Sequence, residues 1–243
     1  MRHMPLESTL ALVRANYDDV RNRVALAAQK SGRPPESVTI VGVTKYVSSE
    51  TARFLVQSGC RDLGESRPQS LWEKAESLAG ESVNWHLIGH LQRNKAKRTL
   101  PLLRMIHSVD SERILEQILV DATLLRLPMQ VLLELNVTSD PTKTGLQKED
   151  AKRILEKWCS RKSDQPSIVS IVGLMGMSSL GASELQVHDE FESIRIARDR
   201  WTQEFDILLP VLSMGMSDDF EIAIEHGSTH VRLGSILFSP RLA

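Results

Sequence analysis

The sequence predicts an α/β fold, a single TIM-type barrel with one extra helix in front of it. Strand-like and helix-like segments alternate along the chain, eight segments are strand-like, and the length is 243 residues. Barrels of this type need eight strand–helix units and typically about 250 residues. A doubly wound open sheet is the competing architecture, but it rarely needs eight consecutive units. No repeat, linker or low-complexity run divides the chain, so we expect one domain over residues 1–243.

The predicted helices and strands follow from apolar periodicity and from the residues that end each segment. The first helix is predicted over 6–30, where apolar side chains recur at helical spacing up to Gly32 and Pro34. The predicted strands are 38–43, 61–64, 83–89, 104–109, 129–136, 168–175, 206–212 and 229–233. The helices between them are predicted over 49–58, 68–78, 92–99, 111–124, 148–159, 183–205 and 218–226. N-caps are predicted at Ser48, at Asp110 or Ser111, and at Ser217.

Composition and charge exclude several classes of protein. The net charge of −1 provides no field that would recruit nucleic acid or an anionic membrane. No stretch approaches the roughly 20 apolar residues of a membrane span, and the N-terminus lacks a signal peptide's apolar core. The two cysteines, Cys60 and Cys159, are too few for a disulfide framework and match no metal-ligand spacing. We therefore expect a cytoplasmic protein without a metal site.

Lys45 follows the apolar strand 38–43 and precedes the helix start at Ser48. In α/β proteins this rim of the sheet is where ligands bind. A lysine beside an apolar strand end is expected to be partly desolvated, which favours the neutral amine, a nucleophile toward carbonyl groups. The alternative interpretation is an ordinary solvated lysine in a loop.

The ends of the last two strands predict a phosphate site. Barrels commonly bind phosphate between the loops after strands seven and eight, with backbone N–H groups and a helix N-terminus. Here the segment 213–219 supplies a hydroxyl at Ser213 and a glycine at Gly215, and 234–235 supplies the facing half. Together with a nucleophilic lysine at strand one, these features would suit an aldehyde that bears a phosphate. Pyridoxal phosphate is the obvious candidate.

Longer motifs carry a family resemblance. They are Val43–Lys45, Gly64–Glu65, His86–Lys95, Gly173–Met175, Gly215–Asp219 and Val231–Ser235. From about Val38 to Phe238 the chain resembles the pyridoxal phosphate homeostasis protein family, a single-barrel relative of the N-terminal domain of alanine racemase.

The resemblance implies a role for each site residue. Lys45 would hold pyridoxal phosphate as a Schiff base, and Arg232 would approach the pyridine nitrogen. The phosphate would be held by four residues, Ser213, Met214, Gly234 and Ser235. The pocket would be lined by His86 and Asn136, with Met175 a weaker candidate.

One position departs from the family pattern. The family usually has Gly-Glu-Asn where this chain has Gly64–Ser66. A serine hydroxyl reaches less far than an asparagine amide, so the contact expected of Ser66 is altered or replaced by water.

The function expected from Arg232 is capture of the cofactor with little or no turnover. A cation beside the ring nitrogen disfavours the pyridinium, and the neutral ring is a poorer electron sink. Racemases with this arrangement compensate with acids and bases, one of them from a second domain or subunit. The chain ends eight residues after Ser235, so we expect no such domain and no catalytic residues.

We expect a monomer that buffers pyridoxal phosphate or delivers it to PLP-dependent apo-enzymes. Two alternatives stay open. One is a PLP-dependent amino-acid racemase, and the other is a Schiff-base aldolase that acts on a sugar phosphate without a cofactor.

Overall fold

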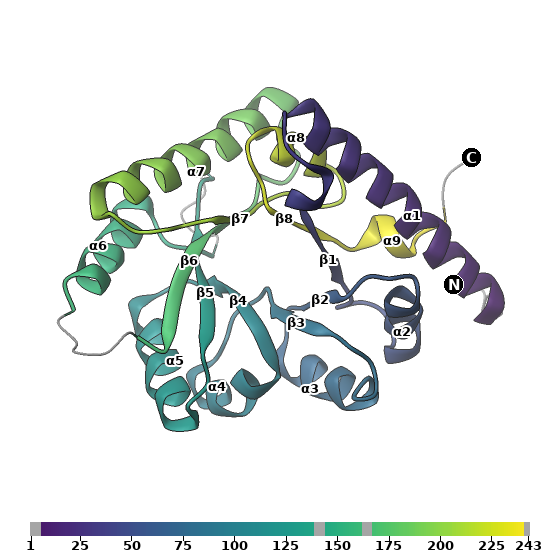
Figure 1. Ribbon diagram of the computed structural model, residues 1–243, viewed down its shortest axis with the longest axis horizontal. Coiled ribbons are helices and arrows are strands. Elements are labelled where there is room, and N and C mark those ends of the chain that lie inside the picture. Colours follow the sequence, from purple (N-terminus) through teal and green to yellow (C-terminus); the bar gives the residue numbers. More distant parts are fainter. Residues whose placement is uncertain (1–5, 139–143, 162–166, 241–243) are drawn as a thin grey trace.

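The computed structural model describes residues 6–138, 144–161 and 167–240 and shows a closed barrel of parallel strands (Figure 1). Neighbouring strands pair in chain order, and β8 pairs with β1 to close the ring. The strands are β1 Thr39–Val43, β2 Asp62–Glu65, β3 Asn84–Leu87, β4 Leu103–Val109, β5 Met129–Leu135, β6 Val169–Gly176, β7 Val211–Ser213 and β8 His230–Leu233. The predicted barrel is confirmed.

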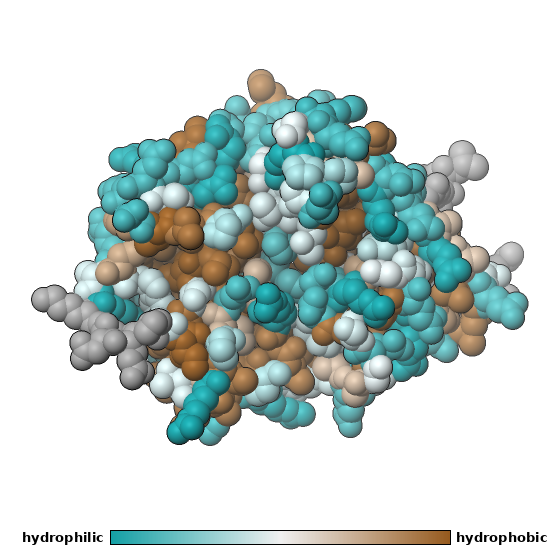
Figure 2. Space-filling model, viewed as in Figure 1, coloured by the Kyte–Doolittle hydropathy of each residue, from teal (hydrophilic) through white to brown (hydrophobic). Residues whose placement is uncertain are grey.

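Helices surround the ring of strands on the outside (Figure 1). They are α1 Leu6–Lys30, α2 Ser49–Gln57, α3 Pro68–Ser77, α4 Arg93–Thr99, α5 Glu112–Leu125, α6 Lys148–Cys159, α7 Glu184–Phe205, α8 Phe220–Glu225 and α9 Ser235–Phe238. On the face that Figure 2 shows, hydrophilic residues lie over most of the edge, where the helices are, with apolar residues visible between them. Among the described residues, no helix is long and apolar enough to cross a membrane.

The extra helix α1, which the sequence predicted at these bounds, covers the seam between β8 and β1. The helix that follows β8, α9, has only 4 residues and is too short for this task. α1 has 25 residues and contacts α2, α8 and α9 instead. Its buried Asn16 amide donates hydrogen bonds to the carbonyls of Leu237 and Ser239, at 3.3 and 3.0 Å. α1 is therefore a structural part of the barrel wall.

Two of the predicted N-caps are confirmed and one is wrong. Ser48 and Ser111 accept hydrogen bonds from the backbone N–H groups three residues on, at 3.2 and 3.4 Å. Ser217 does not cap a helix, because α8 begins only at Phe220, after Asp219. The Ser217 hydroxyl instead accepts from the backbone N–H groups at the start of α9.

The strand predicted over 206–212 is shorter and later than expected, because β7 begins at Val211. α7 ends at Phe205, and Asp206 follows in the left-handed conformation with φ 51°. Pro210 has no N–H and cannot donate to the ladder, so pairing with β6 starts after it. Gly173 on β6 lies so close to β7 that a Cβ there would be 1.8 Å from the Val211 carbonyl oxygen.

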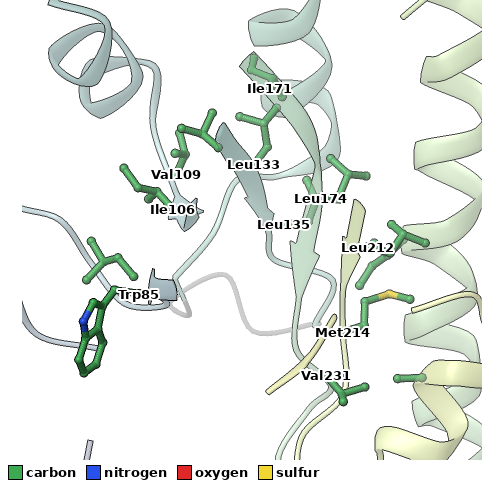
Figure 3. Close-up of a cluster of buried hydrophobic side chains, with 14 of the residues drawn as sticks. Trp85, Ile106, Val109, Leu133, Leu135, Ile171, Leu174, Leu212, Met214 and Val231 are labelled. Atoms are coloured by element: carbon green, nitrogen blue, oxygen red, sulfur yellow. The ribbon is translucent and has the colours of Figure 1, made fainter. Parts of the chain in front are cut away.

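The main apolar core lies between the strands and the helices (Figure 3). Alternate residues such as Leu133 and Leu135 of β5 and Leu212 of β7 are buried on this side. The other residues of each strand face the inside of the barrel. There, Met105, Leu132 and Met175 form a small separate apolar cluster, and much of the remaining interior is polar.

Candidate functional site

The carboxyl ends of β1, β7 and β8 meet at one rim of the barrel. β1 pairs with β8, where Gly42 lies opposite Leu233, and β7 pairs with β8, where Ser213 lies opposite His230. Gly234 packs beside β1, because a Cβ there would be 3.5 Å from the Cβ of Val43. The turn that carries Lys45 therefore starts next to the Gly234 backbone.

Lys45 lies in the turn between β1 and α2, and its side chain is exposed. Its Nζ is 5.0 Å from the centre of the Tyr46 ring, which is itself 89% exposed. The expectation that Lys45 is partly desolvated was therefore wrong. The strand ends at Val43, two residues earlier, and the turn carries the amine out of the apolar environment.

A buried ion pair lies directly behind this turn. Glu65, at the end of β2, is fully buried, and its Oε1 lies 2.5 Å from Nζ of Lys74 on α3. Lys74 also donates to the backbone carbonyl of Thr44 at 2.5 Å, and the Thr44 hydroxyl donates to Glu65 at 2.7 Å. The residue before Lys45 is thus held by both partners of the pair. Sequence reasoning missed it, since a glutamate and a lysine nine positions apart on different elements have no recognisable spacing.

Arg232 and Ser213, both predicted site residues, are in direct contact inside the rim. Nη1 of Arg232 donates to the carbonyl and the hydroxyl oxygen of Ser213, at 2.7 Å each, and Nη2 donates to the Gly176 carbonyl at 3.0 Å. Burial lowers the pKa of Arg232 to about 10, so the guanidinium stays cationic at neutral pH. Burial also raises the pKa of Glu134 on β5, an acid whose charge acts on Arg232.

Backbone N–H groups converge next to this pair. Those of Gly234 and Ile236 both point at the Ser217 hydroxyl oxygen, at 3.4 Å each. Ser235 is the first residue of α9. Gly215 has φ +91°, and a Cβ on it would be 2.7 Å from the Cβ of Ala223, so this turn requires glycine.

Met214, predicted to hold the phosphate, is engaged within the protein through both its backbone N–H and its side chain. Its backbone N–H donates to the His230 carbonyl at 3.2 Å, and its side chain is fully buried in the outer apolar core (Figure 3). A direct contact to a phosphate would need this amide to change partner. The assignment stays a prediction.

His86 lies in the barrel interior, 1% exposed, with both ring nitrogens in hydrogen bonds. Nε2 is 3.0 Å from Oδ1 of Asp62, and Nδ1 is 2.9 Å from Nε2 of His107. His107 in turn lies 2.9 Å from the Ser213 hydroxyl. Sequence reasoning missed His107 and His230, which lies 6.0 Å away between ring centres. Both stand on predicted strands, so inward alternation was the signal that could have found them.

The other predicted residues are spread around the site. Asn136 helps to line a cavity of about 530 Å³ between the ends of β5, β6 and β7, and its Oδ1 accepts from Thr138. Ser66 is half-buried against Gly89, where a Cβ would be 2.5 Å from the Ser66 carbonyl oxygen. Met175 is buried with Met105 and Leu132.

The residues at the rim fit a phosphate-bearing aldehyde. Two N–H groups already converge on one oxygen atom, as they would on a phosphate oxygen. The buried guanidinium of Arg232, on β8, contacts Ser213 at the end of β7. The accessible amine of Lys45 follows the neighbouring strand, β1.

Comparison with known proteins defines the class first. Residues 15–241 match the family model described as alanine racemase, N-terminal domain. An alanine racemase of Clostridium difficile has the same fold, with a TM-score of 0.76 at 14% identity, and this chain covers 57% of that chain.

More similar relatives identify the family within this class. The pyridoxal phosphate homeostasis protein of Aquifex aeolicus is 34% identical over 222 residues, which are 91% of this chain and 95% of that protein. PipY of Synechococcus elongatus, solved with PLP bound, is 30% identical with a TM-score of 0.79, over 90% of this chain and all of that chain. The chain belongs to the pyridoxal phosphate homeostasis protein family, as the motifs predicted.

Proposed function

We propose that this protein binds pyridoxal 5′-phosphate as a Schiff base on Lys45 and serves vitamin B6 homeostasis with little or no turnover. The observation that carries the proposal is the contact between Arg232 and Ser213, beside the converging N–H groups of Gly234 and Ile236. Relatives that cover nearly the whole chain are named for this cofactor or were solved with it bound.

The residues of this chain would divide the work in a simple way. The exposed amine of Lys45 would hold the cofactor, and pyridoxal phosphate would supply the aldehyde carbon to which an amine can bond. Ser213, Gly234 and Ser235, at the ends of β7 and β8, would hold its phosphate. Contacts from Ser66, His86, Asn136 and Met214 stay predictions.

Arg232 would keep catalytic turnover low. A guanidinium has only donors, and its cation beside the ring nitrogen opposes protonation of that nitrogen. Arg232 is held by three hydrogen bonds to Ser213 and Gly176, so it cannot easily turn away. The ring would remain neutral and stabilise a carbanion poorly.

The test is a titration of pyridoxal phosphate into the wild type, Lys45→Ala and the control Lys97→Ala, whose lysine is exposed on α4. We expect a near-visible absorbance, and a mass increase after borohydride reduction, in the wild type and the control but not in Lys45→Ala. A protein that stays colourless would refute the proposal and favour the aldolase alternative. Retained absorbance with rapid loss of optical activity of an alanine solution would favour the racemase.

We propose a cytoplasmic monomer that releases the cofactor to PLP-dependent apo-enzymes. Two free cysteines are compatible with a reducing compartment, and burial raises the pKa of the Cys60 thiol to about 12, which keeps it unreactive. Size-exclusion chromatography and reactivation of a PLP-depleted aminotransferase test the two claims.

A further inference from the structure

A continuous chain of hydrogen bonds runs through the barrel interior from Arg232 to Asp62. Its four links are Arg232 Nη1 to Ser213 Oγ at 2.7 Å, Ser213 Oγ to His107 Nδ1 at 2.9 Å, His107 Nε2 to His86 Nδ1 at 2.9 Å, and His86 Nε2 to Asp62 Oδ1 at 3.0 Å. Ser213 and His107 are fully buried, and the Asp62 side chain is 25% exposed. The chain therefore joins the rim of the site to a carboxylate that solvent reaches.

The position of every proton in this chain follows from its two ends. The Ser213 oxygen accepts from Arg232, which only donates. The Ser213 proton goes to Nδ1 of His107, because the Asp62 carboxylate at the other end only accepts and each neutral imidazole between them accepts on Nδ1 and donates from Nε2. His107 then carries its proton on Nε2 and donates to Nδ1 of His86. His86 carries its proton on Nε2 and donates to the Asp62 carboxylate. All donors thus point from the rim toward Asp62.

This polarity has a consequence for an anion at the rim. With its proton committed to His107, Ser213 presents only oxygen lone pairs to a ligand. A fully ionised phosphate is also an acceptor only, and the two oxygens repel. A phosphate that still carries one proton can donate it to Ser213, because the Ser213 oxygen has a second lone pair besides the one that accepts from Arg232.

The geometry points to a proton path in which His107 and His86 couple anion binding at Ser213 to the uptake of one proton. The phosphate proton passes to Ser213, the Ser213 proton to Nδ1 of His107, and the Nε2 proton of His107 to Nδ1 of His86. Three O–H or N–H bonds break and three form. The products are a fully ionised phosphate that accepts from Ser213, and an imidazolium at His86 against the Asp62 carboxylate.

Charged groups on the surrounding strands fit this direction. His230 and Arg232 of β8 face the two histidines, Asp62 of β2 faces His86, and Glu134 and Asp219 act on Arg232. Burial, with the nearby His86, His230 and Arg232, lowers the pKa of His107 well below its ordinary value. Without an anion the His107 ring therefore stays neutral, and the negative charge of the ligand is what favours the extra proton.

The inference rests on the proposed function, because it takes Ser213 as a phosphate contact. Sulfate is the probe, since it is an acceptor only throughout the neutral range and forms no bond to Lys45. Calorimetric titrations at about pH 7.5, in buffers of different ionisation enthalpy, should show the wild type taking up about one proton per sulfate bound. The sulfate Kd should rise up to about tenfold per pH unit.

Variants separate the path from a merely structural role. His107→Leu removes the acceptor of the Ser213 proton, so sulfate binding should continue without proton uptake. Asp62→Asn, at the solvent-exposed end, removes the carboxylate that stabilises the imidazolium and should move the pH dependence to lower pH. Glu192→Gln is the control, because it removes a carboxylate from the His226 pair on the outer helices and should leave proton uptake unchanged.

Wild type that takes up no proton with sulfate, or that binds no sulfate while it still forms the pyridoxal phosphate adduct, would overturn the path and leave the proposed function intact. Unchanged proton uptake in both His107→Leu and Asp62→Asn would overturn it as well. Failure of the wild type to form the adduct at Lys45 would reject the proposed function instead.

Discussion

Removing Lys74 should destabilise the protein more than the loss of any exposed ion pair. The carboxylate of Glu65 is fully buried, and Lys74 is the only cation that pairs with it in the described parts of the chain. Oε2 of Glu65 has no hydrogen-bond partner there. Without Lys74, Oε1 of Glu65 would keep only the hydrogen bond from the Thr44 hydroxyl. Breaking a buried pair by removing one partner costs about 3–5 kcal/mol, because the remaining charge is uncompensated. We expect a loss of this size in Lys74→Met, where the apolar stem is retained.

The second partner provides the test of the reasoning. The double variant Glu65→Leu/Lys74→Met removes both charges, and such replacements are often neutral or stabilising. It should therefore recover most of the stability that Lys74→Met loses, which a double-mutant cycle would show as strong coupling. Loss of the Lys74 contact to Thr44 should still weaken adduct formation at Lys45 in the double variant.

The measurement is urea unfolding of each variant, with unchanged m-values as evidence that the same transition is followed. Arg23→Met is the control, because the pair of Arg23 with Glu221 joins α1 to α8 with side chains 40% and 37% exposed. An exposed pair contributes at most about 1 kcal/mol. A Lys74→Met variant no less stable than Arg23→Met would refute the argument.

Three further predictions follow from other parts of the structure. Gly215→Ala should lose about 1–3 kcal/mol in urea unfolding, because its φ of +91° and the close Ala223 Cβ leave no room for a side chain. Burial lowers the pKa of His230 to about 4, so the unfolded chain binds the proton first, and stability should fall by up to about 1.4 kcal/mol per pH unit below pH 6.5. A His230→Gln variant with an equally steep loss would contradict this assignment. Iodoacetamide should modify exposed Cys159 in the native protein and buried Cys60 only after unfolding, as mass spectrometry of peptides would show.

The sequence alone determined the order and type of the elements, because these depend on local patterns. Helical spacing of apolar residues predicted α1 and placed α6 at its observed bounds, Lys148–Cys159. Buried runs of β-branched residues predicted the strands, and eight of them over this length predicted a closed barrel. Local signals misplaced β7, where the missing N–H of Pro210 outweighed the apolar pattern before it.

The tertiary structure decided which side chains meet, because their partners lie far apart in the chain. Ser217 accepts a hydrogen bond at the start of α9 and does not cap α8, the helix that follows it in the chain. His107 contacts Ser213, 106 positions away. Such contacts depend on the pairing of strands around the closed ring, which brings distant positions to the same level inside the barrel. The exposure of Lys45 was likewise set by the turn after β1 and by the buried pair behind it, and no pattern of neighbouring residues contains that information.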